Sequence, residues 1–290
     1  MPARINLNLE SLTAQRNLST TNRRFGASVE RISSGLRINR AGDDAAGLTI
    51  SEKLRAQVRG LNQAARNSQD AISLIQTAEG SLNEIHALLQ RMRELAVQGA
   101  NDTLNSIDRD SIRDEVGQLQ TEIDRIANVT QFNHMKLLNG SLTFDFQIGA
   151  NTDTNYEQMA ISPVSVTTAV IGSGSLSGAT SLSASVGGVC NLDGAARVTF
   201  LTLISSLDDA VEDVNRERAQ FGAQQNRLEH TIQQLSVQAE NTAASESRIR
   251  DADIAAEMSE FVRNQILQQA GVAILAQANQ VPTLVLQLLR

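Results

Sequence analysis

A regular apolar repeat in the last third of the chain gives the strongest indication of its fold. Its positions alternate steps of four and three residues without a break: Leu207, Val211, Val214, Arg218, Phe221, Gln225, Leu228, Ile232 and Leu235. A repeat with a period of 3.5 residues predicts a helix whose apolar seam packs against other helices in a coiled coil. Two seam positions, Arg218 and Gln225, are polar, and such positions favour one register over the others at some cost in stability.

Several further segments carry apolar residues at helical spacing. We expect helices over 5–32, 45–99, 108–129 and 254–280, and the seam belongs to a long helix that begins near Ala196. The sequence leaves open whether the helix over 45–99 breaks near Gly60 to Ala65 or continues.

The ends of these helices carry recognisable signals. Ser33-Ser34-Gly35 predicts the end of the first helix, because glycine suits a C-cap. Asp43 and Asp44 precede Ala-rich sequence, so we expect them to cap the second helix rather than to act as paired catalytic carboxylates. Pro282 is expected to interrupt the last helix.

The middle of the chain departs from the helical pattern. Residues 143–161 alternate with a period of two on either side of a Gly-Ala-Asn-Thr-Asp turn, which predicts a β-hairpin. Residues 162–196 are rich in Ser, Thr and Gly and are interpreted as an exposed, low-complexity insert.

Together these segments predict a mainly α fold, an elongated antiparallel helical bundle or coiled coil with paired N- and C-terminal helices and a small β-hairpin region. In such a fold the end helices pack only on each other. Their remaining apolar faces are therefore expected to stay exposed unless neighbouring subunits cover them.

Composition and motifs exclude several function classes. Aromatic residues make up 3% of the chain and Trp is absent, whereas enzyme pockets usually use aromatic bulk. The single Cys190 excludes an intrachain disulfide, and His86, His134 and His230 show no metal-ligand spacing. We find no nucleophile, phosphate-loop or dinucleotide motif, and therefore expect no enzyme activity, no cofactor and no metal.

The net charge and its distribution along the chain limit which classes of partner the protein is expected to bind. The net charge is −7 and the pI about 5.1, which disfavours nucleic acid. Residues 1–60 nevertheless hold ten basic and five acidic side chains. This asymmetry reflects either solvated helix faces or attraction between a basic end and acidic neighbours in an assembly. Residues 264–289 carry no formal charge but are too rich in Gln and Asn to cross a bilayer, so we expect a protein partner and no membrane association.

Three motifs then point to a family. Ser-Ser-Gly-Leu-Arg-Ile-Asn at 33–39, with Ala-Gly-Asp-Asp-Ala-Ala-Gly-Leu at 41–48, closely resembles the N-terminal signature of bacterial flagellins. Gln-Phe-Asn at 131–133, Lys-Leu-Leu at 136–138 and Gln-Ile-Gly-Ala-Asn at 147–151 resemble the flagellin hairpin region. The C-terminal run from Gln265 to Pro282, with Leu-Leu-Arg at 288–290, is similar to the flagellin C-terminus.

The resemblance covers residues 1–161 and 197–290 and implies two domains. The terminal domain, called D0 in flagellins, would comprise 1–43 with 250–290. The rod domain, called D1, would comprise 44–249, including the hairpin 143–161 and the insert 162–196.

The implied function is that of a structural subunit that self-assembles into the helical bacterial flagellar filament used for motility. The implied localisation is secreted, in the extracellular filament, after export through the flagellar type III apparatus. No cleavable signal peptide is visible, which agrees with that route. Besides the homo-polymer itself, the implied partners are the flagellin export chaperone, the filament cap and the hook–filament junction proteins.

Two sets of site residues follow. The apolar stripes of the end helices, combined with the resemblance, assign polymerisation and chaperone binding to Ile5, Leu9, Leu12, Phe261, Ile266, Leu275, Leu284 and Leu288. The run at 89–98 resembles the flagellin segment that the host Toll-like receptor 5 recognises, which implies contacts by Arg91, Glu94 and Leu95, with Glu115 on the neighbouring helix. The residues alone also allow a simpler interpretation. Arg91 and Glu94 would then be ordinary exposed charges three residues apart, and Leu95 would continue the apolar stripe of the helix.

Three alternatives stay open on the sequence. A hook–filament junction protein would share related terminal helices. A secreted flagellin-like adhesin or polysaccharide-binding protein would have to place its site in 162–196, which offers no aromatic platform for sugar stacking. An enzyme-bearing flagellin would need a metal motif, which the sequence does not show.

Overall fold

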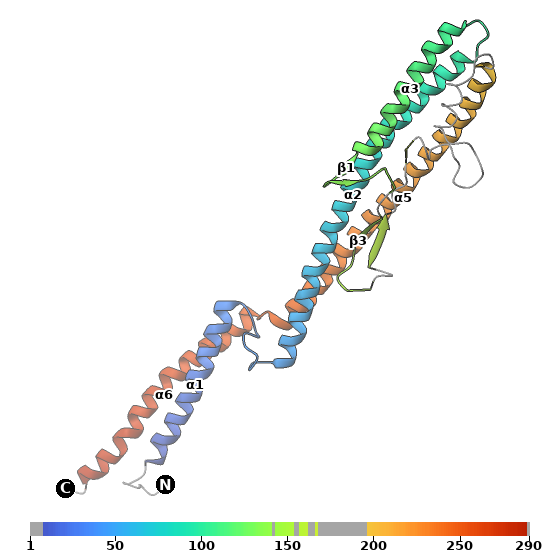
Figure 1. The fold of residues 1–290 in the computed structure, drawn as a ribbon. Coiled ribbons are helices and arrows are strands. Elements are labelled where there is room, and N and C mark those ends of the chain that lie inside the picture. The colour runs from blue at the N-terminus through green and yellow to red at the C-terminus, as the bar shows by residue number, and fades with distance from the viewer. Residues whose placement is uncertain (1–7, 141–142, 154–156, 162–165, 168–195, 289–290) are drawn as a thin grey trace. The chain divides into compact units, whose positions relative to one another are not determined.

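The computed structural model of the chain describes residues 8–140, 143–153, 157–161, 166–167 and 196–288. Its elements in chain order are α1 (Leu9–Ser34), α2 (Ala45–Gly99), α3 (Ser106–Val129), β1 (Gln131–Phe132), β2 (Met135–Lys136), β3 (Phe144–Gln147), β4 (Gln158–Ile161), α5 (Ala196–Arg250) and α6 (Ile254–Leu288) (Figure 1). The mainly α prediction is confirmed. Ile5, Cys190 and nearly all of the Ser/Thr/Gly-rich insert lie outside the described residues.

The chain divides into two compact units, which are described separately. One unit, here called the terminal unit, comprises Met1–Val58 with Glu240–Arg290. The other, here called the bundle unit, comprises Arg59–Ala239. Helices α2 and α5 contribute residues to both. In the part of the chain that the structure describes, no helix combines the length and apolar character needed to cross a membrane.

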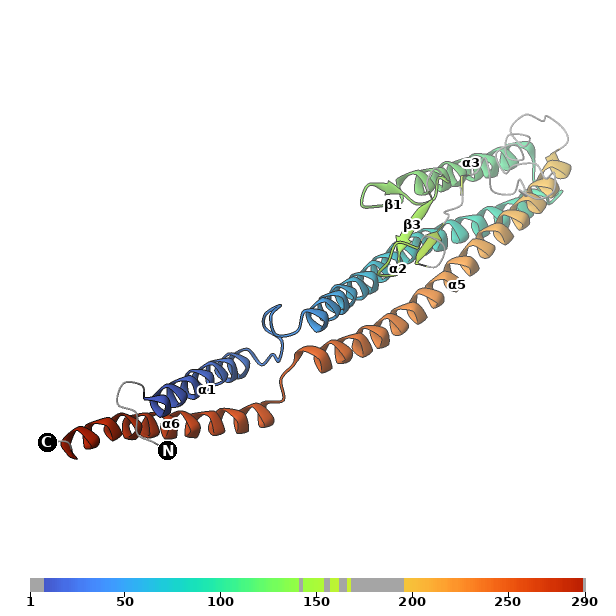
Figure 2. The same cartoon turned by 90° about the horizontal axis from the view of Figure 1, so that it is seen from below.

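In the terminal unit, α1 and α6 lie side by side (Figures 1 and 2). The rings of Phe25 and Phe261 stack with their centroids 5.0 Å apart. Further along the same pair of helices, Arg31 Nη1 lies 3.7 Å from Glu257 Oε2. The predicted pairing of the N- and C-terminal helices is therefore confirmed.

Helix α1 ends as the sequence predicts. Gly35 adopts φ = 70°, and its amide donates to the Arg31 carbonyl oxygen at 2.8 Å. This left-handed conformation is readily available to glycine and closes the helix. Beyond it, Leu36 forms an antiparallel β-bridge with Asp251, so the segment after α1 runs beside the link between α5 and α6.

The two aspartates in the following loop have different roles. Asp44 Oδ1 accepts a hydrogen bond from the Gly47 amide at 2.8 Å, which confirms the predicted capping of α2. Asp43 Oδ2 instead accepts from the amides of Asn39 and Arg40, at 3.1 and 3.0 Å, and holds the loop.

The prediction that Pro282 interrupts the last helix is wrong, because α6 continues to Leu288. Proline lacks an amide hydrogen, so in a helix Pro282 cannot donate to the carbonyl oxygen of Ala278, four residues earlier. Asn8 Nδ2 donates to that oxygen at 2.8 Å. The same Asn8 side chain caps α1 by accepting from the Ser11 amide at 3.0 Å. One asparagine thus satisfies both a helix start and a carbonyl that proline leaves free.

The bundle unit holds the main core. The apolar seam of α5 is buried at every seventh residue and half-buried between these positions, as a coiled coil requires; the fully buried seam positions are Leu207, Val214, Phe221, Leu228 and Leu235. The stripes of α2 and α3 supply the facing side chains, including Leu82, Ile85, Leu89, Met92, Val116 and Ile123. The predicted packing of these stripes is confirmed.

Helices α2 and α5 approach closely at one end of the bundle unit. A Cβ atom on Gly99 would lie 2.5 Å from the buried ring of Phe200, so this position has no room for a side chain. Nearby, Arg93 Nε donates to Asp208 Oδ1 at 2.6 Å.

Two small antiparallel hairpins complete the bundle unit. Strands β3 and β4 pair Phe144 with Ile161, which confirms the predicted hairpin. Strands β1 and β2 were not predicted. They are joined by Asn133 and His134, which have φ values of 47° and 64°, the backbone conformation of a two-residue hairpin turn.

Candidate assembly surface

The most unusual surface of the described chain is that of the α1/α6 pair. In these two helices, only Ser28, Asn264 and Ala278 are buried among the side chains that the structure describes. Two of the three are polar. Ten large apolar side chains remain between 42% and 63% exposed: Leu9, Leu12, Val29, Ile254, Met258, Val262, Ile266, Leu267, Val272 and Ile274. Contiguous apolar surface on soluble proteins usually marks an interaction site.

These exposed residues follow from the helical spacing of the sequence. Ile254, Met258, Val262 and Ile266 recur every four residues along α6 and therefore lie near one another on its surface. The α1/α6 contact uses other positions of the same helix, among them Phe261 and Glu257. Helix α6 thus has apolar side chains in directions that α1 does not cover.

The predicted polymerisation residues fall into three groups. Leu9, Leu12 and Ile266 are exposed on the candidate surface. Phe261 and Leu275 are half-buried, and Phe261 stacks on Phe25 of α1. Leu284 and Leu288 lie within α6, in the part whose side chains the structure does not describe, and Ile5 precedes the described residues.

The predicted receptor residues lie in the bundle unit. Arg91 on α2 donates from Nη2 to Glu115 Oε1 on α3 at 2.9 Å and from Nη1 to Glu94 Oε2 at 3.2 Å. Hydrogen bonds from Glu115 first and Glu94 second raise the pKa of the Arg91 guanidinium above its usual value. All three side chains are about half exposed or more. Leu95 differs from them, because its side chain is buried in the core.

Sequence reasoning missed several polar contacts that position the surface. Asn8 and Ser11 both reach α6, Asn8 through the Ala278 carbonyl and Ser11 Oγ through Asn279 Oδ1 at 2.7 Å. Only the N-cap preference of asparagine indicated a role for Asn8. In the described part of the chain, no group of three or more His, Cys, Asp or Glu side chains is arranged to hold a metal ion.

The fold and this surface define a class of helical structural protein whose terminal helices leave apolar area uncovered. Comparison with known proteins identifies the family. The model of the bacterial flagellin N-terminal helical region matches residues 5–143, and that of the C-terminal helical region matches residues 204–289. The chain belongs to the bacterial flagellin family.

Individual relatives agree. A flagellin of Halalkalibacterium halodurans is 50% identical over 287 residues, covering 99% of each chain. A flagellin of Bacillus subtilis is 48% identical over 304 residues, covering 99% of this chain and all of the relative. The solved structure of a Vibrio parahaemolyticus protein assigned as flagellar hook-associated has a TM-score of 0.60, but at 14% identity over 72% of this chain it shows the fold alone.

These relatives decide between the functions that the sequence left open. Relatives that match nearly the whole chain at about half identity are flagellins, so the chain is a structural subunit of the flagellar filament. The hook–filament junction and adhesin alternatives are not favoured. Flagellins are structural proteins and not enzymes.

Proposed function

We propose that the chain polymerises by burying the exposed apolar residues of α1 and α6 against other copies of itself. The observation that carries this proposal is an imbalance among the side chains that the structure describes in the α1/α6 pair: ten large apolar side chains are exposed and only three residues are buried. Each Å² of apolar surface removed from water contributes about 25 cal/mol. Contacts of this kind that do not close into a ring generate an open helical polymer.

A four-residue substitution tests the proposal. Changing Ile266, Leu267, Val272 and Ile274 to Ser removes apolar side chains that are exposed in the single chain, so the chain should still fold. We expect the critical concentration for filament formation to rise at least about tenfold, since this apolar burial would be lost. Sedimentation of filaments from purified subunits measures it. Deleting residues 264–290 should abolish polymerisation altogether.

The bundle unit provides a matched control. Ile107, Val129, Leu201 and Val237 are equally exposed but belong to that unit, and their change to Ser should leave the critical concentration within about threefold of the unchanged chain. Normal polymerisation of the α6 variant, or equal loss in both variants, would contradict the proposal.

The same surface supports the proposed export partner. An apolar helix face that is exposed before assembly favours aggregation. We therefore propose that the flagellin export chaperone binds this face of α6 before secretion. The eight residues that the sequence analysis assigns to polymerisation, from Ile5 to Leu288, are proposed to serve both contacts. Secretion through the type III apparatus, and contacts with the cap and junction proteins at the two filament ends, belong to the same proposal.

The domain division also remains a proposal. We assign D0 to 1–43 with 250–290 and D1 to 44–249. The ends of α1 and α5, at Ser34 and Arg250, support a division close to these positions, since the connecting segments there have no helical structure.

A second proposed contact is recognition by host Toll-like receptor 5. Arg91, Glu94 and Glu115 form one hydrogen-bonded, exposed cluster across α2 and α3, which supports their assignment as direct contacts. Leu95 would act by packing α2 beneath them, because its side chain is buried. We expect Arg91→Ala to weaken receptor activation about tenfold or more, while Arg125→Ala, which breaks a similar exposed pair with Glu122, has little effect. Equal loss in both variants would contradict the assignment.

A further inference from the structure

The methionines of the chain lie in contrasting surroundings. Met92 and Met159 belong to the core of the bundle unit and are 0% and 3% exposed. Met135 is half-buried against the same core. Met258 lies on α6 and is 42% exposed. Among the methionines that the structure describes, Met258 is therefore the one most open to solvent.

The surroundings of Met258 on α6 are apolar. The side chains three and four residues away from it are those of Ile254, Ala255, Phe261 and Val262. Residues at these spacings are neighbours on the surface of a helix. Ile254 and Val262 are exposed like Met258 itself. Met258 therefore lies within an apolar row, on the surface that the proposed polymerisation would bury.

Hydrogen-bond donors beside Met258 are already engaged. The hydroxyl of the adjacent Ser259 donates to the Ala255 carbonyl oxygen at 3.0 Å. On the other side of Met258, Glu257 pairs with Arg31 of α1 at 3.7 Å. A polar atom added to the Met258 side chain would thus depend on water for its hydrogen bonds.

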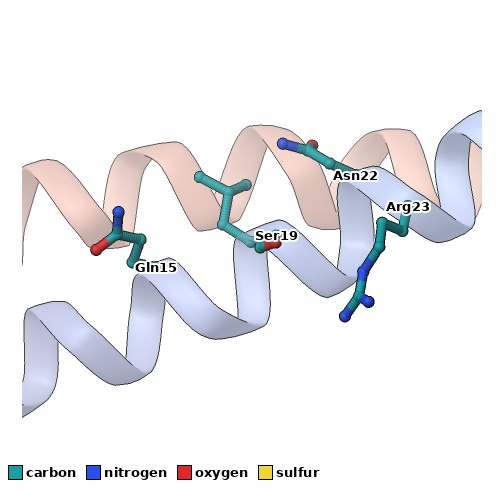
Figure 3. A pocket seen from close by; sticks show the side chains of 5 residues that line it. Gln15, Ser19, Asn22 and Arg23 are labelled. Carbon is teal, nitrogen blue, oxygen red and sulfur yellow. The ribbon is translucent and has the colours of Figure 1, made fainter.

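A polar groove on α1 does not supply these donors either. It is lined by Gln15, Leu18, Ser19, Asn22 and Arg23. Figure 3 shows its four polar side chains following one another along α1. Met258 lies outside this groove, because the adjacent Glu257 contacts Arg31, which is further along α1.

Oxidation would add such a polar atom. A peroxide transfers one oxygen atom to the methionine sulfur and leaves as water or an alcohol, and the thioether becomes a sulfoxide. The product is polar, whereas the original side chain is apolar. In the single chain, water can solvate the sulfoxide at this exposed position. When another copy covers the row, the sulfoxide loses that water without gaining a donor, which is unfavourable.

We propose that Met258 is an oxidation site that controls assembly: a peroxide converts its thioether to the sulfoxide in the unassembled chain, and the sulfoxide weakens polymerisation. The inference rests on the proposed polymerisation and adds a chemical modification that opposes it. Chains within a filament would be protected, because other copies cover the row. Enzymatic reduction of the sulfoxide would restore a subunit that polymerises.

The pattern of oxidation in the full chain tests the site. Purified monomers are treated with hydrogen peroxide, the peroxide is removed with catalase, and peptide mass spectrometry measures the sulfoxide at each methionine. Met258 should oxidise at least about fivefold faster than Met92 and Met159, because these are buried. In preformed filaments its rate should fall at least about fivefold. Equal rates at Met258 in monomers and filaments, or faster oxidation of Met92, would overturn the proposal.

A leucine variant tests the effect on assembly. Met258→Leu keeps an apolar side chain of similar size without the sulfur, so its critical concentration should lie within about threefold of that of the unchanged chain. Peroxide should raise the critical concentration of the unchanged chain at least about fivefold, because an unpaired polar oxygen is buried. It should raise that of Met258→Leu less than about twofold. Met135→Leu is the matched control and should keep the full effect of peroxide.

Reversal completes the test. Methionine sulfoxide reductases specific for the two sulfoxide epimers should return the oxidised chain to its original critical concentration. Circular dichroism should show equal helix content before and after oxidation, because Met258 is exposed. Normal polymerisation of the chain oxidised at Met258, or an equal effect of peroxide on Met258→Leu, would overturn the proposal. Both results leave the proposed apolar assembly standing, which fails only if the α6 serine variant polymerises normally.

Discussion

The α1/α6 pair and the bundle unit use similar sequence patterns but bury very different amounts of apolar surface. In the bundle unit, large side chains of α2, α3 and α5 meet in one continuous core, with residues such as Leu82, Leu89 and Leu207 fully buried. In the α1/α6 pair, the buried positions among the described side chains are Ser28, Asn264 and Ala278. Three or more packed helices enclose a core, whereas two helices leave most of each surface facing outward.

This difference shows how one chain combines a unit that encloses its own core with a helix pair whose apolar side chains remain largely exposed. The bundle unit encloses a continuous core of buried apolar side chains. The α1/α6 pair relies on a ring stack, an ion pair and side-chain hydrogen bonds, including those of Asn8 and Ser11. Such polar contacts contribute about 1 kcal/mol each. They fix how the helices pair while leaving the apolar side chains for other copies.

The comparison is tested most strongly by one leucine from each region. Leu89→Ala should lower the free energy of unfolding by about 2–5 kcal/mol, because Leu89 is 0% exposed and its removal leaves a cavity. Leu267→Ala should change it by less than about 0.5 kcal/mol, because Leu267 is 49% exposed. Chemical denaturation of the monomer, followed by circular dichroism, measures both.

Polymerisation should rank the two leucine variants in the opposite order. Leu267→Ala should raise the critical concentration, whereas Leu89→Ala should leave it nearly unchanged at temperatures where the bundle unit stays folded. A large loss of monomer stability in Leu267→Ala would contradict the conclusion that this surface is exposed in the single chain and contributes little to its stability.

A smaller effect is expected where Asn8 compensates for Pro282. Asn8→Ser keeps a good N-cap acceptor for α1 but removes the amide that donates to the Ala278 carbonyl. We expect the opening of α6 to become easier by about 1 kcal/mol, measured by amide hydrogen exchange between residues 270 and 281.

Pro282→Ala provides the decisive background for that measurement. It restores the backbone amide that can donate to Ala278, so Asn8→Ser should then cost much less in α6. An equal cost of Asn8→Ser in both backgrounds would show that the Asn8 contact does not compensate for the proline.

The helices and their order could be predicted because the apolar periodicity is strong. The seam from Leu207 to Leu235 and the Gly35 stop rest on local rules of helix packing and capping, and the structure confirms both. The apolar stripes of the end helices, such as that of α6, also predicted that the candidate surface would be an exposed apolar one. The pairing of α1 with α6 was predictable because each has an apolar face, and because an antiparallel bundle leaves the two end helices only each other to pack against.

What could not be predicted depends on contacts between distant residues. Local rules predict that Pro282 breaks the helix, and they do not show that the fold brings Asn8 to the Ala278 carbonyl, where it donates a hydrogen bond that the proline cannot. The β1–β2 hairpin escaped notice because its turn uses His134 in a conformation that glycine usually supplies. The burial of Leu95, by contrast, agrees with its place in the apolar stripe of α2, which the sequence already indicated.

The smallest expected effect concerns pH in the loop that follows α1. Backbone hydrogen bonds from Arg40 and then Asn39 lower the pKa of the Asp43 carboxyl. A lowered pKa in the folded state means that the carboxylate stabilises the loop above the ordinary Asp pKa of about 3.9, and that this contribution is lost as the pH falls through the lower folded value. Carboxyl ¹³C NMR should therefore find Asp43 titrating below the ordinary range. Arg40→Ala removes a nearby charge but keeps the backbone amide, so most of the lowering should remain. If Arg40→Ala instead returned the Asp43 pKa to its ordinary value, the Arg40 side-chain charge would be the main cause of the lowering. That result would contradict the role assigned to the backbone hydrogen bonds of the loop.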